Sequence, residues 1–282
     1  MLAFAALALC GLVHAAEPDI SVLARSTSQG EAVLIVAKGL KAAPQGTLAG
    51  KPLAFFPGRK GAYLALAGID LEAAEGSSRL ELTLRDRDGA PHYWSSDVRV
   101  ELKAFPTQEL TVDDKFVRLK PEDEARSERE ASKLKAVFAS ETSALLANGA
   151  FSSPIPGAMS ARFGERRVFN KVPKSPHTGA DLKAKAGEPI KAPASGRVVL
   201  VQDLFYSGNT VVLDHGLGVY TLYAHLSRVD VKEGQEVKAG KRLGLVGATG
   251  RVTGPHLHWG ARVRGARVDP FSLTALPLAD FL

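Results

Sequence analysis

Short apolar segments separated by turn residues are the feature that most limits the fold of this 282-residue chain. Four segments in the first third are rich in β-forming residues, and two of them alternate apolar with polar side chains: 32–36, 62–66, 80–84 and 98–102. Glycine, proline and one Asp-Gly pair separate them. Short strands broken by such turns predict a small β-sandwich, which we expect to be immunoglobulin-like.

Between residues 121 and 148 the spacing of apolar residues changes from the period of a strand to that of a helix. Leu134, Val137 and Phe138 fall on one helical face, and acidic residues occupy the expected first turn, where they favour the helix dipole. An Asn-Gly pair at 148–149 predicts the stop. We interpret this stretch as a helical connector, with an amphipathic membrane helix as the alternative.

From residue 151 onward the pattern returns to β, with many glycines. The stretch predicts one antiparallel sheet domain with little helix. Segments 187–196 and 234–244 resemble each other, and hairpins of this pattern also occur in domains that carry biotin or lipoate. Lys191 and Lys238, however, do not lie between small or Met residues at a tight turn, as a carrier lysine does. The predicted division is a signal peptide at 1–16, a β-sandwich module at 17–106, a linker and helix at 107–150, and a sheet domain at 151–282.

The first residues resemble an export signal. The apolar run at 2–13 is too short to span a bilayer, and small residues follow it at a possible cleavage site after Ala15 or Ala16. No Lys or Arg precedes the run, so an uncleaved anchor and lipidation at Cys10 are alternatives. We expect an exported protein, periplasmic or secreted, with no stable membrane insertion after cleavage.

Charge is unevenly distributed. Residues 151–282 contain 18 Lys and Arg against 10 Asp and Glu, whereas residues 1–150 contain 18 against 20. A positive field favours anionic partners. The chain has no recognisable nucleic-acid motif, so we expect no nucleic-acid partner.

The histidines of the basic half suggest a metal centre. His177 and Asp181 are four residues apart, and His256 and His258 are two apart, so both members of the pair face one side of a strand. Two imidazoles and one carboxylate leave one position of a tetrahedral zinc ion open, as in catalytic sites. The glutamate of a His-Glu-x-x-His motif is missing, so we expect His225 and the spare histidine of the pair to handle protons.

Three motifs carry a family resemblance: Ser-Pro-His-Thr-Gly-Ala-Asp ending at Asp181, Tyr-Ala-His-Leu around His225, and Gly-Pro-His-Leu-His-Trp around His258. Over residues 151–275 the chain resembles the lysostaphin/LytM-type zinc metallopeptidases of family M23, in an exported bacterial form. The chain departs from the family pattern at Ala180, where family members commonly have a larger aliphatic residue before the aspartate.

This resemblance implies one Zn²⁺ ion held by His177, Asp181 and His258, with His225 and His256 as catalytic residues. It also implies peptidoglycan as the partner. We therefore expect a zinc metalloendopeptidase that hydrolyses peptide bonds in peptidoglycan stems or crosslinks. The alternative is a non-catalytic wall-binding protein or an activator of other wall hydrolases.

Three more residues are candidates for substrate binding: Arg251, Asn170 and Tyr223. We expect His215 to be structural. A further hypothesis is that the β-sandwich and the helix cover the zinc groove until they are displaced. The bond that is cut, the oligomeric state and any protein partner do not follow from the sequence.

Overall fold

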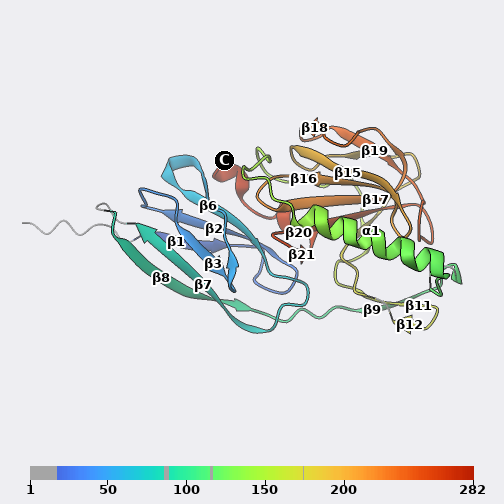
Figure 1. Ribbon diagram of the computed structural model, residues 1–282, viewed down its shortest axis with the longest axis horizontal. Coiled ribbons are helices and arrows are strands. Elements are labelled where there is room, and N and C mark those ends of the chain that lie inside the picture. The colour runs from blue at the N-terminus through green and yellow to red at the C-terminus, as the bar shows by residue number, and fades with distance from the viewer. Residues whose placement is uncertain (1–17, 86–88, 115–116, 174) are drawn as a thin grey trace, which may run out of the picture.

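The computed structural model describes residues 18–85, 89–114, 117–173 and 175–282, and the expected signal peptide lies outside them. Figure 1 shows an elongated molecule in which a β-rich N-terminal part lies beside a larger β-rich C-terminal part. One long helix runs along the C-terminal part. The predicted mainly β fold is confirmed. In the described ranges, no helix is long and apolar enough to cross a membrane.

The N-terminal part is a sandwich of two four-stranded sheets, with strand orders β1-β2-β6-β5 and β4-β3-β7-β8. The strands are β1 (Asp19–Leu23), β2 (Ala32–Lys38), β3 (Gln45–Leu48), β4 (Lys51–Pro52), β5 (Phe56–Pro57), β6 (Tyr63–Gly68), β7 (Gly76–Arg85) and β8 (Pro91–Val100), with a 3₁₀ helix η1 (Arg59–Gly61) before β6. Apolar side chains of both sheets share one core: Val33, Ile35 and Ala65 face Leu80 and Leu82. The predicted sandwich is present, and its immunoglobulin-like topology stays a prediction.

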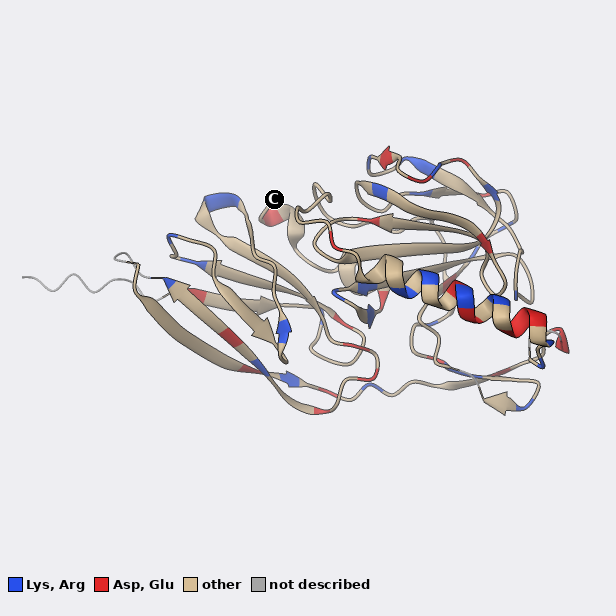
Figure 2. Ribbon diagram, in the orientation of Figure 1, with Lys and Arg blue, Asp and Glu red and all other residues tan. Residues whose placement is uncertain are grey.

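Helix α1 (Pro121–Ala139) begins with proline at a position that needs no N–H donor, followed by three acidic residues. Figure 2 shows these acids at one end of α1 and both signs of charge along it. The helix ends at Ala139, nine residues before the predicted Asn148, and the backbone N–H groups of Leu146 and Ala147 donate to the carbonyl of His215. Tertiary hydrogen bonds therefore hold the segment that follows α1.

The C-terminal part is built on a ten-stranded sheet whose pairings are all antiparallel, as predicted. Its main path is β10 (Met159–Ala161), β13 (Gly179–Lys183), β20 (His256–Val263), β17 (Val219–Val229), β16 (Gly208–Asp214), β15 (Gly196–Leu204) and β18 (Glu236–Val237). Strands β14 (Pro189–Lys191), β19 (Arg242–Val246) and β21 (Ala266–Val268) extend it, and α2 (Pro270–Thr274) and η3 (Leu278–Asp280) follow.

A small sheet joins the predicted linker to the C-terminal part. Strand β9 (Thr107–Leu110) runs parallel to β11 (Arg166–Phe169), and β12 (Val172–Pro173) pairs with the other edge of β11. The linker therefore contributes a strand to the domain that follows the helix.

The two parts also share a core. Val36 and Leu64 of the sandwich belong to the same buried cluster as Val263, Val268 and Leu273 of the C-terminal part. Burial of a continuous apolar surface stabilises both parts together.

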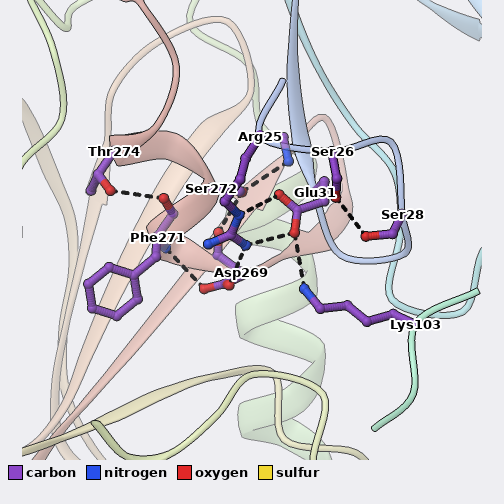
Figure 3. A network of polar contacts seen from close by, with 10 residues as sticks. Arg25, Ser26, Ser28, Glu31, Lys103, Asp269, Phe271, Ser272 and Thr274 are labelled. Atoms are coloured by element: carbon purple, nitrogen blue, oxygen red, sulfur yellow. Dashed lines mark hydrogen bonds and ion pairs between the residues drawn. The ribbon is translucent and has the colours of Figure 1, made fainter. Parts of the chain in front are cut away.

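Polar contacts surround this shared core. Glu31 is only 1% exposed, and its carboxylate forms ion pairs with Arg25 at 2.7 Å and with Lys103 at 3.0 Å (Figure 3). Arg25 also contacts Asp269, which caps the N-terminus of α2, at 2.7 Å. The backbone N–H of Ala32 donates to the hydroxyl of Ser272. These contacts fix the sandwich to the C-terminal part.

Candidate metal centre

Two neighbouring strands bring the three predicted ligands together. Asp181 on β13 lies directly opposite His258 on β20, and His177 precedes β13. His177 Nε2 lies 3.0 Å from Asp181 Oδ1 and 2.9 Å from His258 Nδ1, and Asp181 Oδ1 lies 2.8 Å from His258 Nδ1. Donor atoms this close can share one ion, because zinc lies about 2.0–2.2 Å from nitrogen and oxygen ligands.

The donor set fits one zinc ion. Within the described part of the chain, His177, Asp181 and His258 form the one cluster of three such side chains close enough to hold a metal. Two imidazole nitrogens and one carboxylate oxygen are common ligands of catalytic zinc. Three protein ligands leave one tetrahedral position for water or substrate.

Hydrogen bonds behind the cluster orient its ligands. The Nδ1–H of His177 donates to the carbonyl of Arg162 at 2.9 Å, which leaves Nε2 free to ligate. The guanidinium of Arg167 holds the second oxygen of Asp181 at 2.5 Å. Burial alone would raise the pKa of Asp181, but the neighbouring His177 and His258 outweigh it and hold that pKa well below its usual range. The carboxylate is therefore ionised.

Gly179 lets the His258 ring approach. A Cβ atom at this position would lie 2.5 Å from the carbonyl oxygen of Trp259 and 2.7 Å from His258 Nε2, closer than real Cβ contacts come. The glycine of the His-Thr-Gly-Ala-Asp motif thus has a packing role at the metal centre.

His225 and His256 lie beside the cluster. Their rings are 4.9 Å apart, and the His225 ring is 6.0 Å from that of His258. Each Nδ1–H donates to a backbone carbonyl at 2.8 Å, from His225 to Thr249 and from His256 to Gly254. Burial, aided by the neighbouring His258 and His256, lowers the pKa of His225 to about 3. The neutral ring of His225 therefore presents Nε2 as an acceptor.

A backbone irregularity directs His225 to this site. Tyr223 and Leu226 of β17 belong to the buried core, and regular alternation would send residue 225 into the core after Tyr223. His225 instead has a φ of 66°, and the pairing of β16 with β17 shifts register at this point. Such bulges re-aim side chains near functional sites. His225 therefore lies beside His256 and His258 and not in the core.

The three predicted substrate-binding residues have different positions. Arg251 lines a cavity together with His225, His256 and Asp181. Tyr223 is completely buried and its hydroxyl contacts Thr221, so the prediction that it lines the groove is wrong.

The side chain of Asn170 binds the linker and does not face an open groove. Its side chain accepts from the N–H of Val112 at 3.1 Å and donates to the carbonyl of the same residue at 3.0 Å. These two bonds hold the segment that follows β9 against the hairpin of β11 and β12. The amide of Asn170 is thus occupied within the protein.

Sequence reasoning missed two features of the site. Arg167, which holds Asp181, lies in no motif that would mark it. Gln108, Leu110 and Val112 of the linker line the same cavity as His225 and His256. No periodic signal connects a linker strand to a partner 59 residues away, as in the pairing of Thr107 with Arg166.

His258 also borders another cavity. Leu134 and Phe138 of α1 line a second cavity of about 140 Å³ together with His258 and Thr178. The sandwich sheets do not line either cavity. Among the described residues, α1 and the linker border these cavities, and whether they cover the groove stays a hypothesis.

The prediction that His215 is structural is confirmed. His215 is fully buried, with Nδ1 donating to the carbonyl of Ser195 at 2.8 Å and Nε2 contacting the hydroxyl of Thr221 at 2.7 Å. Trp259 packs in the core on the face of β20 opposite His256 and His258.

Comparison with known proteins points to one family. The sequence model described as peptidase family M23 matches residues 175–270. The chain is 42% identical over 123 residues to the peptidoglycan DD-endopeptidase ShyA of Vibrio cholerae, a match that covers 43% of this chain and 28% of that protein. It is 48% identical over 104 residues to the DD-carboxypeptidase/endopeptidase Mpg of Neisseria meningitidis, covering 37% and 24%. The chain thus spans about a quarter of the length of these curated relatives.

A solved structure extends the similarity to most of the chain. A protein from Pseudomonas aeruginosa assigned to peptidase M23 matches with a TM-score of 0.69 and 34% identity. The match covers 89% of this chain and 96% of that one, so it includes the sandwich as well as the metal centre.

Proposed function

This chain belongs to peptidase family M23, and from that premise we propose that it is a zinc-dependent endopeptidase that hydrolyses peptide bonds in peptidoglycan stems or crosslinks. One observation carries the proposal: two imidazoles, His225 and His256, lie in the same cavity as Asp181, which belongs to a cluster of three side chains that could hold zinc. The names of the curated relatives, which act on peptidoglycan, support the substrate class.

In this proposal His177, Asp181 and His258 hold the metal. Zinc, when bound, polarises a carbonyl and makes water a better nucleophile at neutral pH. Arg167 keeps the carboxylate of Asp181 oriented toward the two imidazoles.

The remaining histidines orient water and move its proton. His225 accepts a hydrogen bond from the attacking water at Nε2, because its Nδ1–H is committed to Thr249. His256, more exposed, takes the proton at Nε2 and then donates it to the leaving amine. As an imidazolium, His256 also stabilises the negative charge that develops on the carbonyl oxygen.

The proposal includes location and organisation. Hydrolysis of the wall requires export, so we propose that residues 1–16 direct the chain to the periplasm. We also propose the division into a module at 17–106, a linker and helix at 107–150 and a peptidase domain at 151–282. No protein partner is proposed.

Purified sacculi and defined crosslinked muropeptides test the activity, with mass spectrometry of the products and metal analysis of each protein. We expect His258→Ala to lose both zinc and cleavage. His256→Ala should retain zinc and lose at least about a hundredfold in kcat. His92→Ala, on β8 of the sandwich, is the control and should match the wild type.

Two outcomes would reject the proposal. Full cleavage by a zinc-free His258→Ala protein would show that the reaction does not need the metal. Release of no new amines by the zinc-loaded wild type would instead favour a wall-binding protein or an activator of other hydrolases.

A further inference from the structure

Arg251 is held firmly in the site but is not neutralised. Its guanidinium lies 4.6 Å from the ring centroid of Phe169 and 4.3 Å from that of Tyr206, stacked between the two rings. Its backbone N–H donates to the carbonyl of Tyr206 at 2.8 Å. Among the residues that the structure describes, no Asp or Glu forms an ion pair with it.

The cavity around Arg251 is positively charged. Its volume is about 120 Å³, and its lining contains Arg167 and Arg251 but only one acid, Asp181. That acid already contacts Arg167 and the zinc ligands. The Nε atom of Arg167 is buried without a hydrogen-bond partner. A bound zinc ion would add further positive charge.

Arg251 is half-buried and has no acidic partner among the described residues, and holding a cation in this way carries a cost. A charge taken out of water without a counter-charge is destabilising, and a guanidinium binds a carboxylate through two parallel hydrogen bonds. Burial, with the nearby Arg167, lowers the pKa of Arg251 to about 10, as expected for a cation that lacks its own anion. Arg251 still remains charged at neutral pH.

We propose that Arg251 binds a free carboxylate of the substrate, on the residue that supplies the leaving amine. This inference rests on the proposed function. The cavity is small, and His225 and His256 lie on its lining with Arg251. The recognised carboxylate therefore lies within one residue of the bond that is cut.

This recognition selects a class of crosslink. In a crosslink whose amine comes from a carbon that also bears a carboxylate, the anion is next to the scissile bond. Diaminopimelate crosslinks have this arrangement. A bridge of glycines places no carboxylate there, and amidation removes the charge. The enzyme should therefore prefer the first class.

Two synthetic crosslinked peptides test the proposal. They are identical except that the carbon beside the scissile nitrogen bears a carboxylate in one and a carboxamide in the other. For the zinc-loaded wild type, kcat/KM should favour the carboxylate by about 30-fold or more, as for buried charge pairs. In Arg251→Gln this ratio should fall to within about threefold of one.

Two further variants sharpen the result. Arg251→Lys keeps the charge but loses the planar fork, so its ratio should lie between those of the wild type and Arg251→Gln. Arg126→Gln is the matched control. Arg126 also lies over a ring, that of Phe205 at 5.9 Å, but lines neither cavity at the metal centre, so the ratio should stay at the wild-type value.

The outcomes are distinguishable. A wild-type ratio near one, or an unchanged ratio in Arg251→Gln, would overturn the assignment of Arg251. Failure of the wild type to cut either peptide or sacculi would instead reject the proposed function. In that case, calorimetric binding of both peptides to the zinc-loaded wild type and to Arg251→Lys still tests the recognition. Equal affinity for carboxylate and carboxamide would then refute it.

Discussion

Two backbone positions shape the metal centre at the scale of single residues. Gly179 leaves room for the His258 ring, and the left-handed conformation of His225 turns its side chain away from the core. Backbone strain of this kind persists only where the surrounding structure holds it. The N–H of His225 donates to the carbonyl of Ser207, which supports the bulge.

Gly179→Ala should weaken zinc binding. The added methyl group must displace His258 or the β20 backbone, and misplacement of a ligand lowers metal affinity by roughly 10–100-fold. Competition with a chromogenic chelator measures the change. Gly149→Ala is the matched control, because its Cβ would contact nothing within 4 Å. Equal zinc affinity in both variants would show that the site tolerates the methyl group.

His215 should make the stability depend on pH. Burial lowers its pKa to about 4, compared with about 6.5 in an unfolded chain. The unfolded state therefore binds more protons as the pH falls below about 6.5. Stability is fully present above that pH and decreases by roughly 3 kcal/mol toward pH 4.

Urea unfolding of the wild type and of His215→Gln at pH 8 and pH 5 measures this contribution. The variant should be less stable at pH 8, because it loses two buried hydrogen bonds, but its stability should fall less at pH 5. Identical slopes with pH in the two proteins would show that His215 does not titrate on unfolding.

The family resemblance implied the three proposed ligands, and the structure brings His177, Asp181 and His258 together as expected. Spacing in a strand explained only that His256 and His258 share a face. Tyr223 was misassigned because β17 is buried on both faces at that point, which an apolar run does not distinguish from one half-buried face. Arg167 acts through a contact made only in the folded chain.

At the scale of elements, β9 is the least expected feature. It lies in the predicted linker, yet it pairs in parallel with β11 and brings Gln108 and Leu110 to the cavity. Parallel pairing joins segments that are far apart in sequence, and propensity in a four-residue stretch is too weak to reveal it. The strands of the main sheet were predicted better, because their alternation and turns are local.

Asn170→Gly should loosen the linker over the groove. Asn170 has a φ of 48°, which glycine adopts freely, so the substitution removes only the two hydrogen bonds to Val112. Hydrogen exchange at residues 107–112 should become faster, and cleavage of intact sacculi should rise about threefold. Loss of one or two partly buried hydrogen bonds changes local opening by such amounts.

Lys171→Gly is the matched control for this test. Lys171 is the other residue of the same turn, with a φ of 69°, and its side chain is exposed. Exchange and cleavage in this variant should match the wild type. If Asn170→Gly loosens the segment without any gain in cleavage, the linker does not limit access of the wall to the site.

At the scale of the whole molecule, the sandwich is a fixed part of the peptidase. Its outer face shares one apolar cluster with β20, β21 and α2, and Figure 3 shows the ion pairs beside it. The sequence predicted two β-rich units but not their joint core. An apolar residue that packs against a second domain cannot be distinguished, by sequence alone, from one that packs within its own sandwich. A fixed sandwich also means that regulation by swinging the whole module would have to break this core.

Glu31→Gln should destabilise both parts together. Arg25 and Lys103 would lose their shared buried carboxylate, but both cations are more than 30% exposed and stay partly hydrated. We therefore expect a loss of roughly 2–3 kcal/mol, below the full cost of breaking a buried pair. Glu236→Gln, from an exposed pair with Arg197, is the control and should change stability by less than about 0.5 kcal/mol.

The two tryptophans report whether the loss is shared. Trp94 lies in the sandwich and Trp259 in the peptidase core, so Trp94→Phe leaves fluorescence that follows the peptidase core alone. Because the parts share one apolar cluster, this fluorescence and far-UV circular dichroism should give one coincident urea transition, and Glu31→Gln should shift both equally. Separate transitions, with the fluorescence midpoint unmoved by Glu31→Gln, would mean that the sandwich unfolds on its own and that the shared cluster does not join the two parts.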